Sequence, residues 1–333
     1  GRGRMMTFTV TDRAQRLGIS GPEALLSYIR NLPGVDAVGL ESRAGGLATR
    51  SLKKSSKSGA LDLIIRLIDL TTLEGADTAG KVRSLVAKAV TPDASFPETP
   101  RVAAVCVYPD MVEHAVAALG NRHGDGVTGI AVASVATAFP SGRSTLDIKI
   151  ADTRYAVEMG ADEIDMVIDR GAALSGDWLK VYGEIAAIRA ACTRPDGTHA
   201  HLKVILETGE LATYDLIKQM SWLAIIAGGD FIKTSTGKVQ PAATLATTVL
   251  MLEVVRDWFA LTGEKIGVKP AGGIRQSKDA IRYLVAVAET VGEEWLHPHL
   301  FRFGASSLLN DVLIQRQKFI TGHYSGPDYV TID

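Results

Sequence analysis

The chain has 333 residues, of which 46% are hydrophobic and 22% are charged, and its formal net charge at pH 7 is -1. This near-neutral balance lacks the basic face expected of a protein that binds nucleic acid or an anionic membrane. No apolar run approaches the roughly 20 residues needed to span a bilayer. The length would accommodate two average domains, but an α/β barrel of about 250 residues forms only one.

Cys106 and Cys192 are the only cysteines. Two cysteines are too few for a disulfide framework, and no apolar segment typical of a signal peptide follows the N-terminus. Disulfides are rare in the reducing cytosol, so this cysteine usage favours a cytoplasmic location.

Residues 1–60 are mostly helical in pattern. A short helix is predicted over Asp12–Leu17, and Pro22 indicates the start of another, because proline is tolerated in the first helical turn. Ser51–Gly59 is rich in lysine and serine and has no periodicity, which predicts a linker. This segment is therefore expected to be accessory to a larger domain.

From about residue 61 onward, short apolar segments alternate with amphipathic helical ones. Eight strands are predicted, at Leu63–Ile68, Val102–Val107, Gly129–Val135, Glu163–Ile168, Leu202–Leu206, Asp230–Ile232, Lys265–Val268 and Phe301–Phe303. The intervening helical pattern is clearest at Ser144–Met159, Trp178–Ala191, Ala242–Phe259 and Ser277–Glu289. This alternation indicates parallel strands joined by helical crossovers.

A closed barrel uses eight strands without leaving an unpaired edge, and an open doubly wound sheet is the alternative. The open sheet usually has a Gly-rich turn after its first strand, but here the segment 69–73 (DLTTL) follows it. The favoured fold is therefore an α/β (β/α)8 TIM barrel over residues 61–320. It is preceded by an N-terminal helical extension over residues 1–60 and followed by a tail over residues 321–333.

Two lysines follow predicted buried strands. Lys233 follows Phe231-Ile232, and Lys269 follows Gly267-Val268. Because burying an unpaired charge is costly, each lysine should lie where its strand ends and a cavity begins. A desolvated lysine near another cation loses proton affinity and can act as a nucleophile. The alternative is that each is merely the first solvated loop residue, but small, Gly-containing loops after both strands favour a site.

Other polar residues fall at predicted strand ends, where the active sites of barrels lie. Asp69, Asp165 and Glu207 could form an acid–base system with the lysines, since such groups shift one another's pKa. A structural ion pair is an equal alternative for Asp165, and a structural role is favoured for Asp69 and Glu207 taken alone. Cys106 is interpreted as a small buried hydrophobic residue rather than a nucleophile.

Two loops of small residues indicate a phosphate site. Gly272 and Gly273 follow the seventh predicted strand, while Ser306 and Ser307 follow the eighth and open a helix. Backbone N–H groups at a helix N-terminus bind anions, and barrels often hold a phosphate in these two loops. Lys238, in the sixth loop, would add a positive charge.

The sequence gives little support for a metal or an organic cofactor. The pairs His199/His201 and His297/His299 precede strands, so they lie at the end of the barrel opposite the lysines, and they are interpreted as solvated loop residues. There is no Gly-x-Gly-x-x-Gly motif and no serine nucleophile elbow. We expect neither a metal nor a cofactor.

Seven segments between about residues 61 and 320 carry a recognisable pattern: residues 67–73 (LIDLTTL), 104–109 (AVCVYP), 163–165 (EID), 206–211 (LETGEL), 230–238 (DFIKTSTGK), 268–275 (VKPAGGIR) and 303–309 (FGASSLL). In this order they together resemble the deoxyribose-phosphate aldolase family of class I (Schiff-base) aldolases, which have a (β/α)8 barrel. The long N-terminal segment is more similar to the eukaryotic branch of this family.

The resemblance implies reversible cleavage of 2-deoxy-D-ribose 5-phosphate into acetaldehyde and D-glyceraldehyde 3-phosphate, without a metal. Lys233 matches the Schiff-base lysine, Lys269 the second lysine that perturbs it, and Asp165 the carboxylate that moves protons with Lys269 and a water. A mobile C-terminal tyrosine of the family has two candidates here, Tyr324 and Tyr329. Substrate and phosphate contacts are matched by Asp69, Gly237, Lys238, Gly272, Gly273, Ser306 and Ser307.

The family is often dimeric, so a homodimer is one expectation for the assembly. Two functional alternatives remain at this stage. One is a Schiff-base aldolase of different specificity, for example for a ketose phosphate. The other is a barrel that binds a sugar phosphate for regulation without turnover, although such a protein has no use for a neutral amine.

Overall fold

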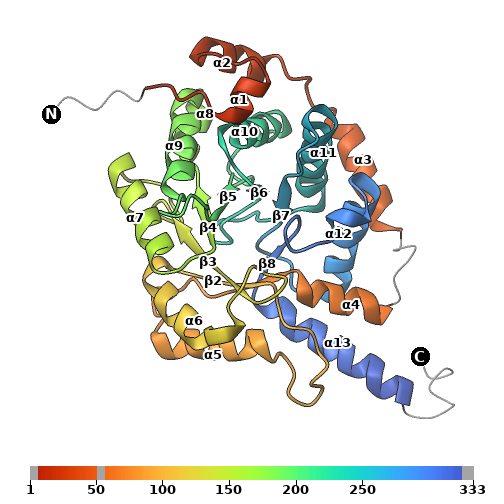
Figure 1. The fold of residues 1–333 in the computed structure, drawn as a ribbon. Helices are drawn as coiled ribbons and strands as arrows, with labels where there is room; N and C mark the ends of the chain where they lie inside the picture. Colours follow the sequence, from red (N-terminus) through yellow and green to blue (C-terminus); the bar gives the residue numbers. More distant parts are fainter. Residues whose placement is uncertain (1–6, 51–56, 325–333) are drawn as a thin grey trace.

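The computed structural model describes residues 7–50 and 57–324. Eight parallel strands alternate with helices along the chain (Figure 1). The strands are β1 (Ile68–Thr71), β2 (Ala104–Val107), β3 (Ala131–Ala136), β4 (Glu163–Val167), β5 (His201–Ile205), β6 (Phe231–Lys233), β7 (Gly267–Lys269) and β8 (Phe303–Ala305).

Helices cover the outside of these strands. The α-helices are α1 (Asp12–Arg16), α2 (Pro22–Arg30), α3 (Ala37–Ala48), α4 (Lys57–Arg66), α5 (Ala79–Val90), α6 (Val112–Leu119), α7 (Leu146–Glu158), α8 (Arg170–Ser175), α9 (Trp178–Ala191), α10 (Tyr214–Ala227), α11 (Leu245–Thr262), α12 (Ser277–Thr290) and α13 (Ser307–Tyr324). Three short 3-10 turns are η1 (Pro109–Met111), η2 (Gly120–Arg122) and η3 (Glu293–Trp295). Among the described residues, no helix is long and apolar enough to cross a membrane.

The sheet closes into a barrel. Its strands pair in the order β7-β6-β5-β4-β3-β2-β1-β8, all in parallel. Single bridges between Val268 and Phe301 and between Ala271 and Gly304 join the two remaining edges. The predicted (β/α)8 barrel is therefore confirmed. Closure matters for function because the ends of all eight strands then meet around one site.

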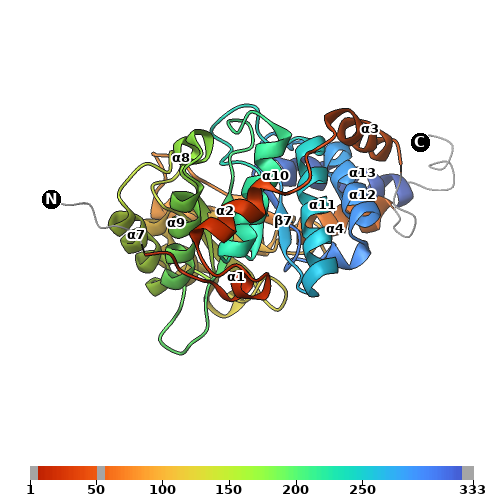
Figure 2. The same ribbon diagram turned by 90° about the horizontal axis from the view of Figure 1, so that it is seen from above.

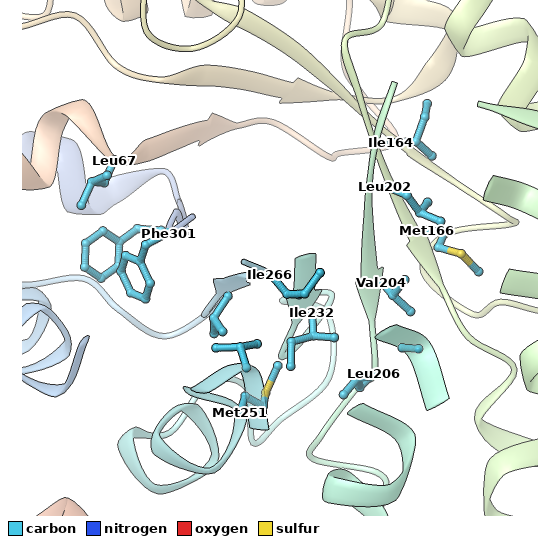
Figure 3. Close-up of a cluster of buried hydrophobic side chains, with 14 of the residues drawn as sticks. Leu67, Ile164, Met166, Leu202, Val204, Leu206, Ile232, Met251, Ile266 and Phe301 are labelled. Carbon is cyan, nitrogen blue, oxygen red and sulfur yellow. The ribbon is translucent and has the colours of Figure 1, made fainter. Parts of the chain in front are cut away.

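Side chains alternate between the two faces of each strand. Figure 3 shows Ile164 and Met166 of β4 pointing outward toward the helices, as do Leu202 and Val204 of β5. The intervening residues must face the barrel interior, because successive side chains of a strand point in opposite directions. Among these inward residues are charged ones, including Lys203.

The first predicted strand is wrong over most of its length. Residues 63–66 belong to α4, and β1 begins only at Ile68. Ala60, Leu61, Ile64 and Ile65 are buried together, which is the spacing of one helical face. A short apolar run fits a buried helix as well as a strand, so periodicity alone could not separate them.

The predicted linker at Ser51–Gly59 is only partly tested, because residues 51–56 lie outside the described part of the chain. Lys57–Gly59 form the first turn of α4 rather than a linker, and the domain limit at residue 60 falls inside this helix. The limit at residue 320 similarly falls inside α13, which continues to Tyr324. Tyr329 lies outside the described residues.

The N-terminal helices α1–α3 lie on the outside of the helices α9–α12 (Figure 2). Arg13 of α1 donates hydrogen bonds to the carbonyl oxygens of Ile225 (2.8 Å) and Gly229 (2.6 Å) and forms an ion pair with Glu264 (2.9 Å). Leu25 of α2 is fully buried in the same hydrophobic core as the barrel. The described residues of the extension therefore pack onto the barrel and share its hydrophobic core.

The four histidines predicted to be solvated are in fact half-buried and grouped at the N-terminal end of the barrel. The ring centroids of His199 and His201 are 6.1 Å apart, those of His201 and His299 are 6.0 Å apart, and those of His297 and His299 are 5.0 Å apart. Burial lowers the pKa of His201, and burial together with the neighbouring His299 lowers the pKa of His297.

This cluster predicts a loss of stability in mild acid. Because the folded state lowers the pKa of His201 and His297, it binds fewer protons than the unfolded chain below about pH 6.5, so the free energy of unfolding should fall there. Urea unfolding at pH 7.5 and 5.5 should show this loss, and His201→Gln should reduce it. An equal loss in His201→Gln would contradict the assignment. His123 acts in the opposite sense, since its hydrogen bond with Asp162 raises its pKa.

Candidate active site

A pocket of about 600 Å³ opens at the C-terminal ends of the strands. It contains Lys233 and the residues predicted to contact phosphate, which are Gly237, Lys238, Gly272, Gly273, Ser306 and Ser307. Lys233 is 3% exposed, whereas Asp69, Asp165 and Lys269 have no exposed surface. The three fully buried residues therefore form a layer beneath Lys233.

Lys233 and Lys269 are the last residues of β6 and β7, and their Cα atoms are paired across the two strands. Each ammonium contacts the same carboxylate oxygen, Oδ2 of Asp165, with Nζ–O distances of 2.9 Å for Lys233 and 2.7 Å for Lys269. Both lysines are buried strand residues, so the alternative of solvated loop lysines is wrong. The structure also brings the two lysines and Asp165 together as predicted.

The pKa values of Lys233 and Lys269 are shifted in opposite directions. Burial lowers the pKa of Lys233, and the neighbouring Lys269 lowers it further, although Asp165 opposes both. Burial also acts on Lys269, but there the carboxylates of Asp165 and Asp69 outweigh it and raise its pKa. Burial disfavours the Asp165 carboxylate, yet the surrounding lysines hold its pKa well below the ordinary value. The arrangement thus favours a neutral amine at Lys233 beside a charged Lys269 and an ionised Asp165.

Asp69 was predicted to contact substrate, but it lies in the buried layer. Its carboxylate forms ion pairs with Lys269 at 2.6 Å and Arg302 at 2.6 Å. These cations outweigh burial and lower the pKa of Asp69. A substrate contact by Asp69 stays a prediction.

Three charged residues of the barrel interior were not identified from the sequence. Lys203 of β5 donates to Glu163 at 2.7 Å and to Asp165 at 2.8 Å. Arg302 donates to both carboxylate oxygens of Glu163, at 2.9 and 2.7 Å. All three side chains are buried. Lys203 contacts Asp165 directly, and Glu163 links Lys203 to Arg302.

A signal for these residues exists in the sequence. Lys203 lies between Leu202 and Val204, and Arg302 lies between two phenylalanines. A charged residue flanked by two apolar ones within a strand occupies the opposite face, which in a barrel is the interior. None of the three lies at the C-terminal end of a strand: Glu163 begins β4, Lys203 is in the middle of β5, and Arg302 precedes β8.

Glu207 and Cys106 have structural surroundings. The Glu207 carboxylate accepts hydrogen bonds from the backbone N–H of Thr236 (3.2 Å) and from its hydroxyl (2.6 Å), which fixes the loop after β6. Cys106 is fully buried, and burial raises the pKa of its thiol. A neutral, buried thiol agrees with the interpretation of Cys106 as a small hydrophobic residue.

The loops after β6, β7 and β8 form the pocket rim. Gly272 has φ +80°, and an added Cβ would lie 2.7 Å from the Cβ of Ala242, so only glycine fits there. Ser307 is the first residue of α13, an 18-residue helix. The free N–H groups at the N-terminus of such a helix favour the binding of an anion. Lys238 forms an ion pair with Glu74 at 3.1 Å across the rim.

Among the described residues, no group of three or more histidine, cysteine, aspartate or glutamate side chains is arranged to hold a metal ion. A second cavity of about 480 Å³ lies between the α2–α3 connection and the loops after β5 and β6, and it contains none of the predicted site residues.

Comparison with known proteins identifies close similarities. The model of the DeoC/LacD family aldolases matches residues 63–313. Human deoxyribose-phosphate aldolase is 44% identical over 286 residues, covering 84% of this chain and 87% of the human one. The mouse enzyme is 43% identical over 313 residues, covering 92% and 96%. The solved tetrameric deoxyribose phosphate aldolase from Aeropyrum pernix has a TM-score of 0.58 at 25% identity, covering 84% of this chain and 97% of that one.

Proposed function

Because this chain belongs to the DeoC/LacD aldolase family, we propose that it cleaves 2-deoxy-D-ribose 5-phosphate reversibly into acetaldehyde and D-glyceraldehyde 3-phosphate, through a Schiff base on Lys233. One observation carries the choice of nucleophile. Lys233 lines the pocket that holds the phosphate-binding loops, while Lys269 is fully buried behind it. Only the first of the two amines is placed to meet an aldehyde carbon.

The reaction begins with attack of the neutral Lys233 amine on the C1 aldehyde. Asp165 lies within hydrogen-bond reach of both that amine and Lys269, so the Asp165–Lys269 pair can return a proton to the carbinolamine oxygen as water leaves. Loss of the proton from the C3 hydroxyl then breaks the C2–C3 bond. The electron pair moves into the iminium, which leaves an enamine on Lys233 and releases D-glyceraldehyde 3-phosphate. Protonation at C2 and hydrolysis release acetaldehyde and restore the amine.

The phosphate end of the substrate is held away from the chemistry. The N-terminus of α13 and the glycine loop after β7 line the same pocket as Lys233. Binding the phosphate there positions C1 against the amine, and such positioning lowers the entropic part of the barrier.

Covalent trapping tests the proposal. The protein would be incubated with acetaldehyde or the sugar phosphate and sodium borohydride, digested, and mapped by mass spectrometry. The expected result is a single reduced adduct on the peptide containing Lys233. An adduct on Lys269, or none, would remove the assignment.

The phosphate contacts predict a selective kinetic effect. Ser306→Val and Ser307→Val should each raise KM for the phosphorylated sugar by about tenfold or more, because a hydrogen bond to a charged group contributes roughly 1.5–3 kcal/mol. KM for free 2-deoxyribose should change little, and Ser95→Val, an exposed serine outside the pocket, should change neither. Equal effects on both sugars would argue against a phosphate site.

A homodimer and a cytoplasmic location stay predictions from the sequence. The A. pernix relative is tetrameric, so its oligomeric state differs from the dimer predicted for this chain. Sedimentation velocity at several protein concentrations would measure the oligomeric state directly.

A further inference from the structure

Lys233 and the buried charged residues beneath it form a cluster with more bases than acids. Its bases are Lys203, Lys233, Lys269 and Arg302, and its acids are Asp69, Glu163 and Asp165. All seven side chains are at most 3% exposed. An unbalanced buried charge is costly, and a titratable group usually neutralises instead. With three carboxylates ionised, charge balance leaves one of the four bases without a proton.

The contacts identify which base that is. Arg302 pairs with Asp69 and Glu163, and Lys269 pairs with Asp69 and Asp165. Lys203 contacts Glu163 at 2.7 Å, Asp165 at 2.8 Å and Asp69 at 3.5 Å. Among the described residues, Lys233 has a single carboxylate contact, Asp165. The base with the fewest anionic partners loses its proton at the lowest cost.

Other groups around Lys233 do not alter this count. Cys106 faces it from β2 as a neutral thiol, since burial raises the thiol pKa. At the pocket rim, Lys238 pairs with Glu74, Lys81 pairs with Asp77, and Arg275 is exposed to solvent. Glu207, in the loop after β5, lies 4.0 Å from Arg170.

We propose that Lys203 is a positioning residue for the aldolase reaction: together with Glu163 and Arg302 it completes a charge-balanced set of six ions that leaves Lys233 as the unprotonated amine. The inference rests on the proposed function, because it assigns Lys203 a task only if Lys233 is the nucleophile. Lys203 does not line the pocket and acts through Asp165, which it contacts at 2.8 Å.

The charge count makes directional predictions. Lys203→Met leaves three bases and three acids, so Lys233 should now hold a proton. Glu163→Gln leaves four bases and two acids, so Lys233 should lose its proton even more readily. The double variant Lys203→Met/Glu163→Gln leaves three bases and two acids, which restores the excess of one base found in the natural chain. If Lys203 had a purely structural role, Lys203→Met and Glu163→Gln would not shift the protonation of Lys233 in opposite directions, and the double variant would not restore it.

The measurement is the rate of reductive trapping of acetaldehyde on Lys233 with cyanoborohydride between pH 5 and 10, with peptide mapping at each pH. Lys203→Met should move the midpoint of this profile to higher pH by about one pH unit or more, which makes trapping roughly tenfold slower below the midpoint. Glu163→Gln should move it to lower pH. The double variant should return toward the natural protein, and Lys203→Arg should keep the natural midpoint.

Lys149→Met is the matched control. Lys149 is also buried and pairs with a buried carboxylate, Glu184, at 3.1 Å, but this pair joins α7 to α9 outside the barrel. Lys149→Met should lower the free energy of unfolding without shifting the pH profile of trapping on Lys233. An unchanged midpoint in Lys203→Met, or shifts of the same sign in Lys203→Met and Glu163→Gln, would overturn the inference. If Lys203→Met does not fold, Glu163→Gln and the double variant carry the test. Failure of the natural protein to trap at Lys233 at any pH would instead overturn the proposed function.

Discussion

Lys233→Met is expected to lower kcat/KM for the sugar phosphate by about 10⁴-fold or more, because removing a covalent nucleophile removes the whole reaction path and not one contact along it. The fold should survive the change. Among the described residues the Lys233 side chain forms one hydrogen bond, to Asp165, and methionine fills a similar buried volume beside the pocket. Steady-state kinetics and urea unfolding of the same preparation measure both effects.

Lys238→Met is the control for this prediction. It removes a lysine five residues further along, from the same pocket, but one that is exposed and paired with Glu74. We expect a weaker affinity for the phosphorylated sugar and an intact borohydride adduct on Lys233. Retention of turnover in Lys233→Met, or loss of the adduct in Lys238→Met, would exchange the roles of the two lysines.

The fold could be predicted from the sequence because its signal is repeated. Eight alternations of an apolar segment with a helical one leave few arrangements, and an error in a single segment does not change the architecture. That error occurred at residues 63–66, where the helix α4 runs directly into β1 and a single apolar run serves both elements. Boundaries of this kind depend on tertiary packing, which local periodicity does not contain.

The site residues likewise fall into some that could be predicted from the sequence and some that could not. Lys233 and Lys269 could be predicted because each is the last residue of an apolar strand, whereas Asp165 lies in the middle of β4 and was found through its carboxylate type. Lys203 and Arg302 could not be placed by that criterion, since Lys203 lies in the middle of β5 and Arg302 lies just before β8. Their partners are distant in sequence: Arg302 contacts Glu163 of β4 across the barrel. Such pairing follows from closure, which no local pattern records.

Asp165→Asn is expected to damage both catalysis and stability. Its carboxylate accepts hydrogen bonds from three lysine side chains, through Oδ1 from Lys203 and through Oδ2 from Lys233 and Lys269. An amide cannot take up the protons that carbinolamine formation and dehydration require, so kcat should fall by about 10²–10⁴-fold. The free energy of unfolding at pH 7 should fall by about 3–5 kcal/mol, because the variant leaves buried cations without their shared anion.

Glu184→Gln separates these two effects. It removes a buried carboxylate that pairs with Lys149 at 3.1 Å between α7 and α9, away from the pocket. A similar loss of stability with an unchanged kcat is expected. If Asp165→Asn also kept its kcat, proton transfer would have to be assigned to another group. Lys269 could not take over that task alone, because the carboxylates that hold its charge also keep its proton from being released near neutral pH. Asp165 and Lys269, joined by a 2.7 Å hydrogen bond, are therefore expected to move the proton as a pair, so that loss of either member should lower kcat.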